Sequence, residues 1–275
     1  MRLSISNLAW DPAHDDAIAG LLQGFAVDAI EIAPTKYFPE PRQVEPGSIA
    51  SVRRAWRDRG IDIVAMQSLL FRTTGLNLFS SRAVQDAMLD HLAHIARIGA
   101  GLGAGRLVFG SPKNRDRQGL DMASAMVTAT GFFRRLGDIA ASAGCIVCLE
   151  PNPASYGCNF MTTTAEAAEV VHHTAHPSIR LQFDIGAVTS NGEDAAELLG
   201  RYHALVGHVH ISEPGLTPLG SSQADHARLG TLLRRLLPPD MSVSIEMLTP
   251  AGSDQIDTVR GALQLATQYY RDGVD

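Results

Sequence analysis

Near the middle of the chain, Cys145-Ile-Val-Cys-Leu149 is followed at once by Glu150-Pro151-Asn152-Pro153. A short, continuous apolar run of this kind is typical of a buried strand. Its carboxylate stands at the C-terminal end of that strand, which is where a parallel (β/α) barrel presents its working residues. The same arrangement recurs on later strands, and that repetition predicts both the architecture and the site.

Short β-type runs alternate with longer helical patterns along the whole chain. The predicted strands span residues 2–8, 28–33, 62–68, 106–110, 145–150, 179–184, 205–212 and 242–247. The predicted helices lie near 14–25, 47–59, 82–103, 119–143, 163–175, 193–200, 225–236 and 254–272. Eight such units without a linker between them favour an α/β fold, a (β/α)8 TIM barrel that forms one domain over residues 1–275. An open, doubly wound sheet is the alternative.

Composition narrows the range of partners. Apolar residues make up 45% of the chain and charged residues 19%, an ordinary balance for a soluble globular enzyme. The net charge of -6 argues against a nucleic-acid or anionic-membrane partner, because either needs a basic face. The N-terminus lacks the apolar segment of a signal peptide, and no stretch approaches the ~18 apolar residues of a membrane span. We therefore expect a cytoplasmic protein.

The cysteines do not indicate a redox or zinc motif. Cys145 and Cys148 form a C-x-x-C inside the predicted strand, no second pair exists, and Cys158 stands alone. Free cysteine is among the most buried residue types, so we expect core thiols.

Four consecutive predicted strands carry groups able to bind a metal. The fifth ends at Glu150, the sixth at Asp184 and the eighth at Glu246, while the seventh carries His210. An unpaired carboxylate after apolar residues is costly, and a shared cation relieves that cost. Ligands of this kind suit Mn²⁺, Co²⁺, Mg²⁺ or Zn²⁺, so we predict one divalent metal ion at these residues. The alternative is that each acid caps a helix or pairs with an arginine.

The order and spacing of these residues resemble the xylose isomerase-like TIM barrel superfamily, the sugar phosphate isomerase/epimerase family. Ketose 3-epimerases, hydroxypyruvate isomerase, inosose dehydratase and the endonuclease IV group belong to it. The resemblance covers nearly the whole chain. The motifs that carry it are Leu149-Glu150-Pro151, His208-Val-His210-Ile-Ser-Glu213 and Ser244-Ile-Glu246.

This resemblance implies a metal-dependent isomerase or epimerase of a sugar or sugar phosphate. The metal would act as a Lewis acid that stabilises a cis-enediolate. Glu150 and Glu246, as catalytic residues on opposite sides of the sugar, would exchange a proton with carbon. Return of the proton to the opposite face gives epimerisation, and return to the neighbouring carbon gives isomerisation. Members often form dimers or tetramers, so a homo-oligomer is a further expectation.

The chain departs from the ketose epimerases at two positions. Those enzymes carry a histidine three residues after the acid of strand six, where this chain has Ala187, and an arginine after strand seven, where residues 215–218 offer none. His226, at the start of the following helix, is a candidate substitute for the missing imidazole. The alternative is that His226 faces solvent in the first turn of that helix.

Further residues at strand ends are candidates for substrate binding. Lys36 and Lys113 are the only lysines, and each stands just beyond a strand, where a compact donor would meet a hydroxyl, carboxylate or phosphate. The remaining expected contacts come from Gln67, Asn152, His208 and Glu213.

Three other functions remain open on this site. A dehydratase (a lyase) would use the same metal and acids to expel water from a keto-polyol. A nuclease of the endonuclease IV type needs extra histidines from the early strands, and the first four predicted strands end without one. A non-catalytic sugar-binding barrel would bind ligand without proton exchange.

Overall fold

Eight parallel strands close into a barrel in the computed structural model, which describes residues 1–222 and 224–271. Each strand pairs with the next in sequence, and β8 pairs with β1 through Leu3 and Val243. The strands are β1 (Arg2–Ser6), β2 (Ala29–Ile32), β3 (Asp62–Met66), β4 (Arg106–Phe109), β5 (Ile146–Leu149), β6 (Ile179–Asp184), β7 (Val206–Ser212) and β8 (Ser242–Glu246). The predicted barrel is therefore confirmed, and the open sheet is wrong.

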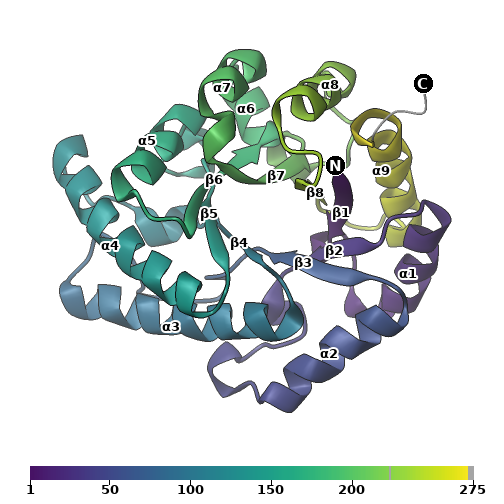
Figure 1. Cartoon of the computed structure of the whole chain (residues 1–275), viewed down its shortest axis with the longest axis horizontal. Coiled ribbons are helices and arrows are strands. Elements are labelled where there is room, and N and C mark those ends of the chain that lie inside the picture. Colours follow the sequence, from purple (N-terminus) through teal and green to yellow (C-terminus); the bar gives the residue numbers. More distant parts are fainter. Residues whose placement is uncertain (223, 272–275) are drawn as a thin grey trace.

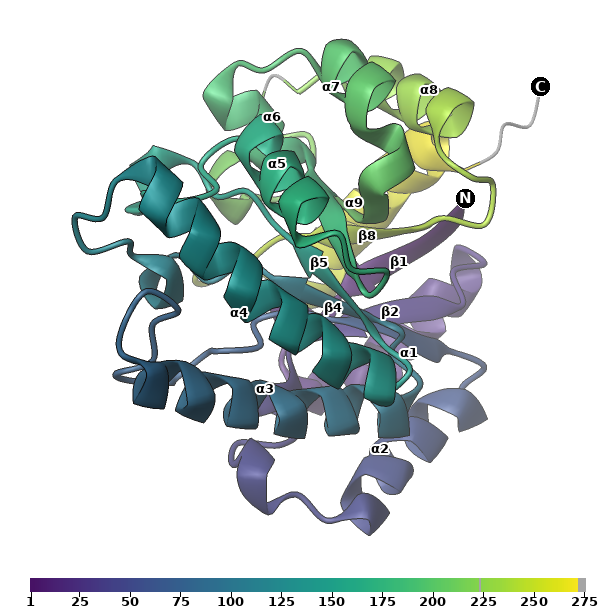
Figure 2. The same ribbon diagram turned by 60° about the vertical axis from the view of Figure 1, so that its left-hand side comes forward.

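Helices surround the barrel (Figure 1), and Figure 2 shows α3 and α4 side by side on its outside. The helices are α1 (Asp15–Gly24), α2 (Pro46–Asp58), α3 (Arg82–Leu102), α4 (Met122–Ser142), α5 (Thr164–Thr174), α6 (Ile185–Asn191), α7 (Ala195–Tyr202), α8 (His226–Leu236) and α9 (Gln255–Tyr270). Residue 272, the predicted end of the last helix, lies outside the described residues. Within the described part of the chain, no helix has the length and apolar character that a membrane span requires.

One helix was not predicted. The helix α6 begins directly after β6, without a loop, because the side chain of Asp184 accepts a hydrogen bond from the backbone N–H of Ala187 at 2.5 Å. A carboxylate in this position satisfies a free amide of the first helical turn. The apolar run after Asp184 gave no sign of a boundary between strand and helix.

The last three strands alternate between two environments. On β7, Val209 and Ile211 belong to the apolar core, while His208, His210 and Ser212 are fully buried polar residues between them. Side chains of a strand point alternately to its two faces, so one set packs against the helices and the other fills the barrel. The polar interior of the barrel is what positions the candidate site.

The cysteines are core thiols, as predicted. All three are free and buried. Burial raises the pKa of the Cys148 thiol to about 12. A thiol with so high a pKa is almost entirely protonated at neutral pH and is therefore a poor nucleophile.

Candidate metal centre and active site

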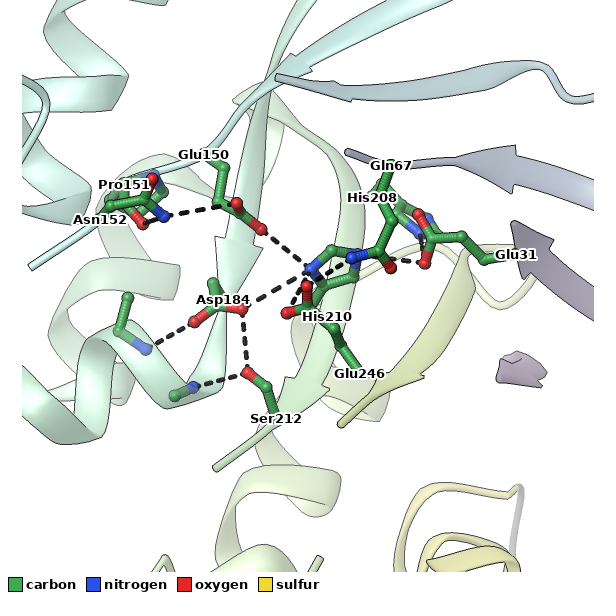
Figure 3. A network of polar contacts seen from close by, with 12 residues as sticks. Glu31, Gln67, Glu150, Pro151, Asn152, Asp184, His208, His210, Ser212 and Glu246 are labelled. Carbon is green, nitrogen blue, oxygen red and sulfur yellow. Dashed lines mark hydrogen bonds and ion pairs between the residues drawn. The ribbon is translucent and has the colours of Figure 1, made fainter. Parts of the chain in front are cut away.

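The four predicted metal ligands meet at the C-terminal ends of β5 to β8 (Figure 3). The Nδ1 atom of His210 lies 2.9 Å from Oε1 of Glu150, 3.1 Å from Oε2 of Glu246 and 3.6 Å from Oδ2 of Asp184. All four side chains are buried, and one ligand atom from each lies within 4.8 Å of the others. The strand ends thus bring three carboxylates to one face of a single imidazole.

This arrangement fits a divalent cation. Ligand atoms bonded to one octahedral ion at about 2.1 Å lie about 3 Å from their neighbours, which matches the spacing around Nδ1. Nδ1 of His210 and Oε1 of Glu150 are both buried, and they have no hydrogen-bond partner outside this cluster of candidate ligands. Three acids with one imidazole also leave an excess of negative charge, and a buried excess of this kind is costly unless a cation balances it.

The pKa values reflect this crowding of charge. Burial raises the pKa of Glu150 to about 7, and the charge of neighbouring Glu246 adds to the rise, while His210 opposes it. Burial alone lowers the pKa of His210, but the charges of Glu246 and Glu31 outweigh it and raise that pKa well above its ordinary value. The protein without a cation therefore holds protons where a metal would otherwise supply the positive charge.

Glu31 on β2 belongs to the site and was missed by the sequence analysis. Its Oε2 atom lies 3.1 Å from Nε2 of His210 and 3.7 Å from Nε2 of His208, and its side chain is fully buried. A hydrogen bond from Nε2–H of His210 leaves Nδ1 with its lone pair free to bind metal. A signal existed in the sequence, because Glu31 interrupts an otherwise apolar strand, Ala29–Ile32.

Asp184 is held in place from two sides. The hydroxyl of Ser212 donates to Oδ2 at 2.9 Å, and the N–H of Ala187 donates to Oδ1. Ser212 accepts in turn from the N–H of Gly186 at 2.8 Å. Asp184 therefore caps a helix, as the alternative reading of the strand-end acids expected, and also faces the other three candidate ligands.

Glu150 depends on a glycine and an arginine that the sequence analysis did not select. A Cβ atom at Gly110, just after β4, would lie 1.8 Å from Oε2 of Glu150, so a larger residue there displaces the carboxylate. Arg115 is fully buried and donates to the backbone oxygen of Glu150 at 2.7 Å and to Oδ1 of Asn152 at 2.8 Å. Asn152 contacts Oε2 of Glu150 at 3.4 Å.

A cavity of about 280 Å³ opens onto these groups, close to the lower end of the roughly 300–1,000 Å³ typical of small-molecule sites. Both predicted catalytic glutamates, Glu150 and Glu246, line it. Of the predicted substrate-binding residues, the cavity wall contains Gln67, Asn152 and Glu213. Gln67 donates from Nε2 to Oε1 of Glu246 at 2.5 Å.

Three other predicted substrate-binding residues do not line the cavity. The ammonium of Lys36 donates to the backbone carbonyls of Asn7 and Trp10, so its donors are used within the protein. Lys113 is exposed and lies off the cavity wall. His208 is fully buried inside the barrel, beside Glu31. The position of a residue after a strand did not reveal the direction of its side chain.

His226 also occupies neither of its predicted positions. It is buried rather than solvent-facing, and it does not line the cavity. Its Nε2 atom lies 2.9 Å from Oε1 of Glu213, and its Nδ1 atom lies 2.5 Å from the hydroxyl oxygen of Tyr270. Burial alone raises the pKa of Glu213, but hydrogen bonds from His226 and Ser222 outweigh it and lower that pKa. His226 therefore supports a carboxylate of the cavity wall from behind.

Comparisons with known proteins show the same fold. The chain superimposes on D-psicose 3-epimerase from Clostridium cellulolyticum H10 with D-tagatose, with a TM-score of 0.81, 15% identity and coverage of 98% of this chain and 99% of that one. It superimposes on the 3-keto-D-glucoside 4-epimerase from E. coli with a TM-score of 0.77 and 18% identity, covering 97% of this chain and 99% of that one. It superimposes on the IOLI protein with a bound zinc atom with a TM-score of 0.77 and 17% identity, covering 98% of each chain.

At such low identity these likenesses show the fold alone, and a search of the curated proteins gives no match. The sequence itself supplies the family. The profile of the xylose isomerase-like TIM barrel family matches residues 21–253, which include all four candidate ligands. The chain therefore belongs to the xylose isomerase-like TIM barrel family.

Proposed function

We propose that this protein is a divalent-metal-dependent isomerase or epimerase of a small sugar, with Glu150 and Glu246 transferring the proton. The observation that carries the proposal is the placement of these two carboxylates. They come from β5 and β8, they lie 2.9 and 3.1 Å from the same nitrogen of His210, and both line the cavity. A carbon atom of a bound sugar between them is within reach of two proton acceptors.

The surrounding residues suit the two glutamates to this work. Gln67 donates to one oxygen of Glu246, and the other oxygen faces His210. Asn152 lies near Oε2 of Glu150, while Oε1 faces His210. In each glutamate one oxygen thus faces the proposed metal ligand His210 and the other lies against an amide side chain, and this fixes the orientation of the carboxylate for proton transfer with carbon. Mn²⁺, Co²⁺, Mg²⁺ or Zn²⁺ at the four ligands would supply Lewis acidity toward a sugar carbonyl.

The comparisons support the substrate class. Two of the similar structures are named as sugar epimerases, one of them solved with D-tagatose, and a third holds a zinc atom. The chain covers these proteins almost completely. The proposal therefore extends to a sugar as the partner molecule and to a metal ion as cofactor.

Exchange of carbon-bound hydrogen with solvent tests this function. The protein loaded in turn with Mn²⁺, Co²⁺, Mg²⁺ and Zn²⁺ is incubated in D₂O with a panel of ketohexoses, and deuterium in the sugar is measured by mass spectrometry. We expect incorporation without loss of water, and its abolition in Glu150→Gln and Glu246→Gln. Glu169→Gln, at an exposed position of α5, is the matched control and retains exchange. Loss of water would indicate the dehydratase instead, and no exchange with any metal contradicts the proposal.

A further inference from the structure

The wall of the candidate active-site cavity is acidic, and the described residues that line it include no cationic side chain. Among the described residues, no lysine, arginine or histidine lines it, whereas four carboxylates do: Glu150, Asp184, Glu213 and Glu246. Phosphate recognition in proteins relies on arginine, lysine or free backbone N–H groups. One metal ion at the four ligands leaves the remainder of the wall without positive charge. A phosphate at the far end of a sugar would therefore meet no cationic side chain of the described wall.

The described cations near the cavity either have partners within the protein or lie off its wall. Arg115 donates to the backbone of Glu150 and to Asn152, and it is fully buried. Lys36 donates to backbone carbonyls. The guanidinium of Arg72 lies 5.6 Å from the ring centre of Phe71, but Arg72 itself does not line the cavity.

The backbone of the wall offers little to an anion either. Gly186 and Ala187 line the cavity at the first turn of α6, the position at which a helix commonly binds phosphate. The N–H of Gly186 already donates to Ser212, and the N–H of Ala187 donates to Asp184. Both amides are thus satisfied within the protein.

Beyond the carboxylates the wall is mainly apolar, with polar side chains at Gln67, Ser68, Ser111, Asn152 and Tyr156. The carboxylates form its buried end, since Glu150 and Glu246 are only 8% and 7% exposed, whereas Phe71 and Tyr156 are 58% and 44% exposed and stand at the mouth. Apolar side chains lie along the wall, including Leu8, Leu69, Leu70, Val108, Phe109 and Leu216. A hydroxyl pressed against such a wall loses its water partners, whereas an alkyl group gains about 25 cal/mol for each Å² removed from water.

From the charge and polarity of this wall we infer that the substrate is a keto sugar without phosphate, which carries an apolar group at the end remote from the metal ligands. The inference rests on the proposed function, because that function assigns the keto end of the sugar to the metal ligands. It excludes the sugar phosphates that the sequence left open, and it assigns specificity to the mouth, above all to Phe71.

Matched sugars test this inference by binding alone. Calorimetry with the Mn²⁺-loaded protein measures the affinity for D-fructose, D-psicose, D-tagatose and D-sorbose. Each is tested in three forms: the parent sugar, its 6-deoxy derivative and its 6-phosphate. For the stereoisomer that binds best, we expect the 6-deoxy sugar to bind at least as tightly as its parent. We expect the 6-phosphate to bind at least about tenfold more weakly, a difference of ~1.4 kcal/mol.

A charge placed at the mouth provides a second readout. Phe71→Arg is expected to weaken binding of the 6-deoxy sugar. It should strengthen binding of the 6-phosphate by about two- to fivefold, which is the range of an exposed charge pair. Val127→Arg is the control: it adds the same charge at a 75% exposed site on α4 that does not line the cavity. We expect it to leave the order of affinities of the three sugars unchanged.

Tighter binding of a 6-phosphate than of its parent by the unmodified protein overturns the inference, as does the absence of binding by every sugar. Hydrogen exchange in D₂O distinguishes this failure from failure of the proposed function. A phosphorylated sugar that exchanges refutes only the substrate class, whereas a tightly bound neutral sugar that never exchanges refutes only the chemistry.

Discussion

Glu31 on β2 accepts a hydrogen bond from Nε2 of His210 on β7 at 3.1 Å, across the interior of the barrel. The same imidazole turns its Nδ1 atom toward the three acids of the site. Metal-binding histidines commonly donate their second ring N–H to a carboxylate, which fixes the tautomer and the ring orientation. This relationship links a buried acid that does not line the cavity to the affinity of the metal site.

Substitution of Glu31 is therefore expected to weaken metal binding. Loss of an outer partner of this kind typically costs 10- to 100-fold in metal affinity, so we expect about that change for Glu31→Leu. Glu31→Gln keeps an acceptor but loses the charge, so its effect should be smaller. Calorimetric titration measures the Mn²⁺ affinity of each variant, and Glu169→Gln, at an exposed position, is the control. Equal affinity in all three variants would show that His210 needs no support from Glu31.

Gly110 is expected to be irreplaceable for a local reason. A methyl group there would lie 1.8 Å from Oε2 of Glu150, so Gly110→Ala must displace that carboxylate. We expect weaker metal binding and hydrogen exchange at least about tenfold slower, a barrier increase of ~1.4 kcal/mol. Gly105→Ala, where no atom lies within 4 Å, is the matched control. Normal exchange in Gly110→Ala would mean that the position of Glu150 is not critical.

His226 is expected to act through Glu213. Removal of His226 takes one buried hydrogen-bond partner from Glu213 and one from the hydroxyl of Tyr270, so His226→Ala should lower the free energy of unfolding by about 1–3 kcal/mol. The effect on hydrogen exchange should appear mainly in KM, because Glu213 lines the cavity but lies outside the metal ligands. Urea unfolding measures the free energy of unfolding, and steady-state kinetics measures KM and kcat. A loss confined to kcat would instead place His226 at the reacting carbon.

The buried thiols should be unreactive in the folded protein. Burial raises the pKa of Cys148 to about 12, and the reactive form is the thiolate, so its reactive fraction at pH 8 is very small and rises only as pH approaches 12. We expect the native protein to give almost no reaction with a thiol reagent at pH 8 and full labelling of all three cysteines in denaturant. Rapid native labelling of Cys148 would show that β5 is accessible.

The sequence predicted the barrel and the four strand-end ligands because both depend on local pattern. Glu150 follows the apolar strand β5, Glu246 ends β8, and parallel strands place their C-terminal ends together. The motif from His208 to Glu213 also indicated the family, which the family profile over residues 21–253 confirms. Helix α6 escaped detection because Asp184 serves as strand end and helix cap at once.

Contacts between distant strands were beyond the reach of the sequence. Glu31 meets His210 only because β2 and β7 face each other across a closed barrel. Lys36 stands just beyond β2, as expected of a substrate ligand, yet its flexible side chain reaches the backbone after β1. His226 lies in the first turn of α8 with its ring directed to Tyr270 on α9. Side-chain direction depends on neighbours that a linear pattern does not contain.

Direct measurement of bound metal tests the central claim most simply. The protein is stripped with chelator, reconstituted in turn with Mn²⁺, Co²⁺, Mg²⁺ and Zn²⁺, dialysed and assayed for metal per chain. We predict close to one divalent ion per chain for the unmodified protein and for Glu169→Gln, and a large loss for Glu246→Gln. Absence of bound ion with every metal, or full retention of it in Glu246→Gln, would contradict the assignment of Glu150, Asp184, His210 and Glu246 as a metal centre.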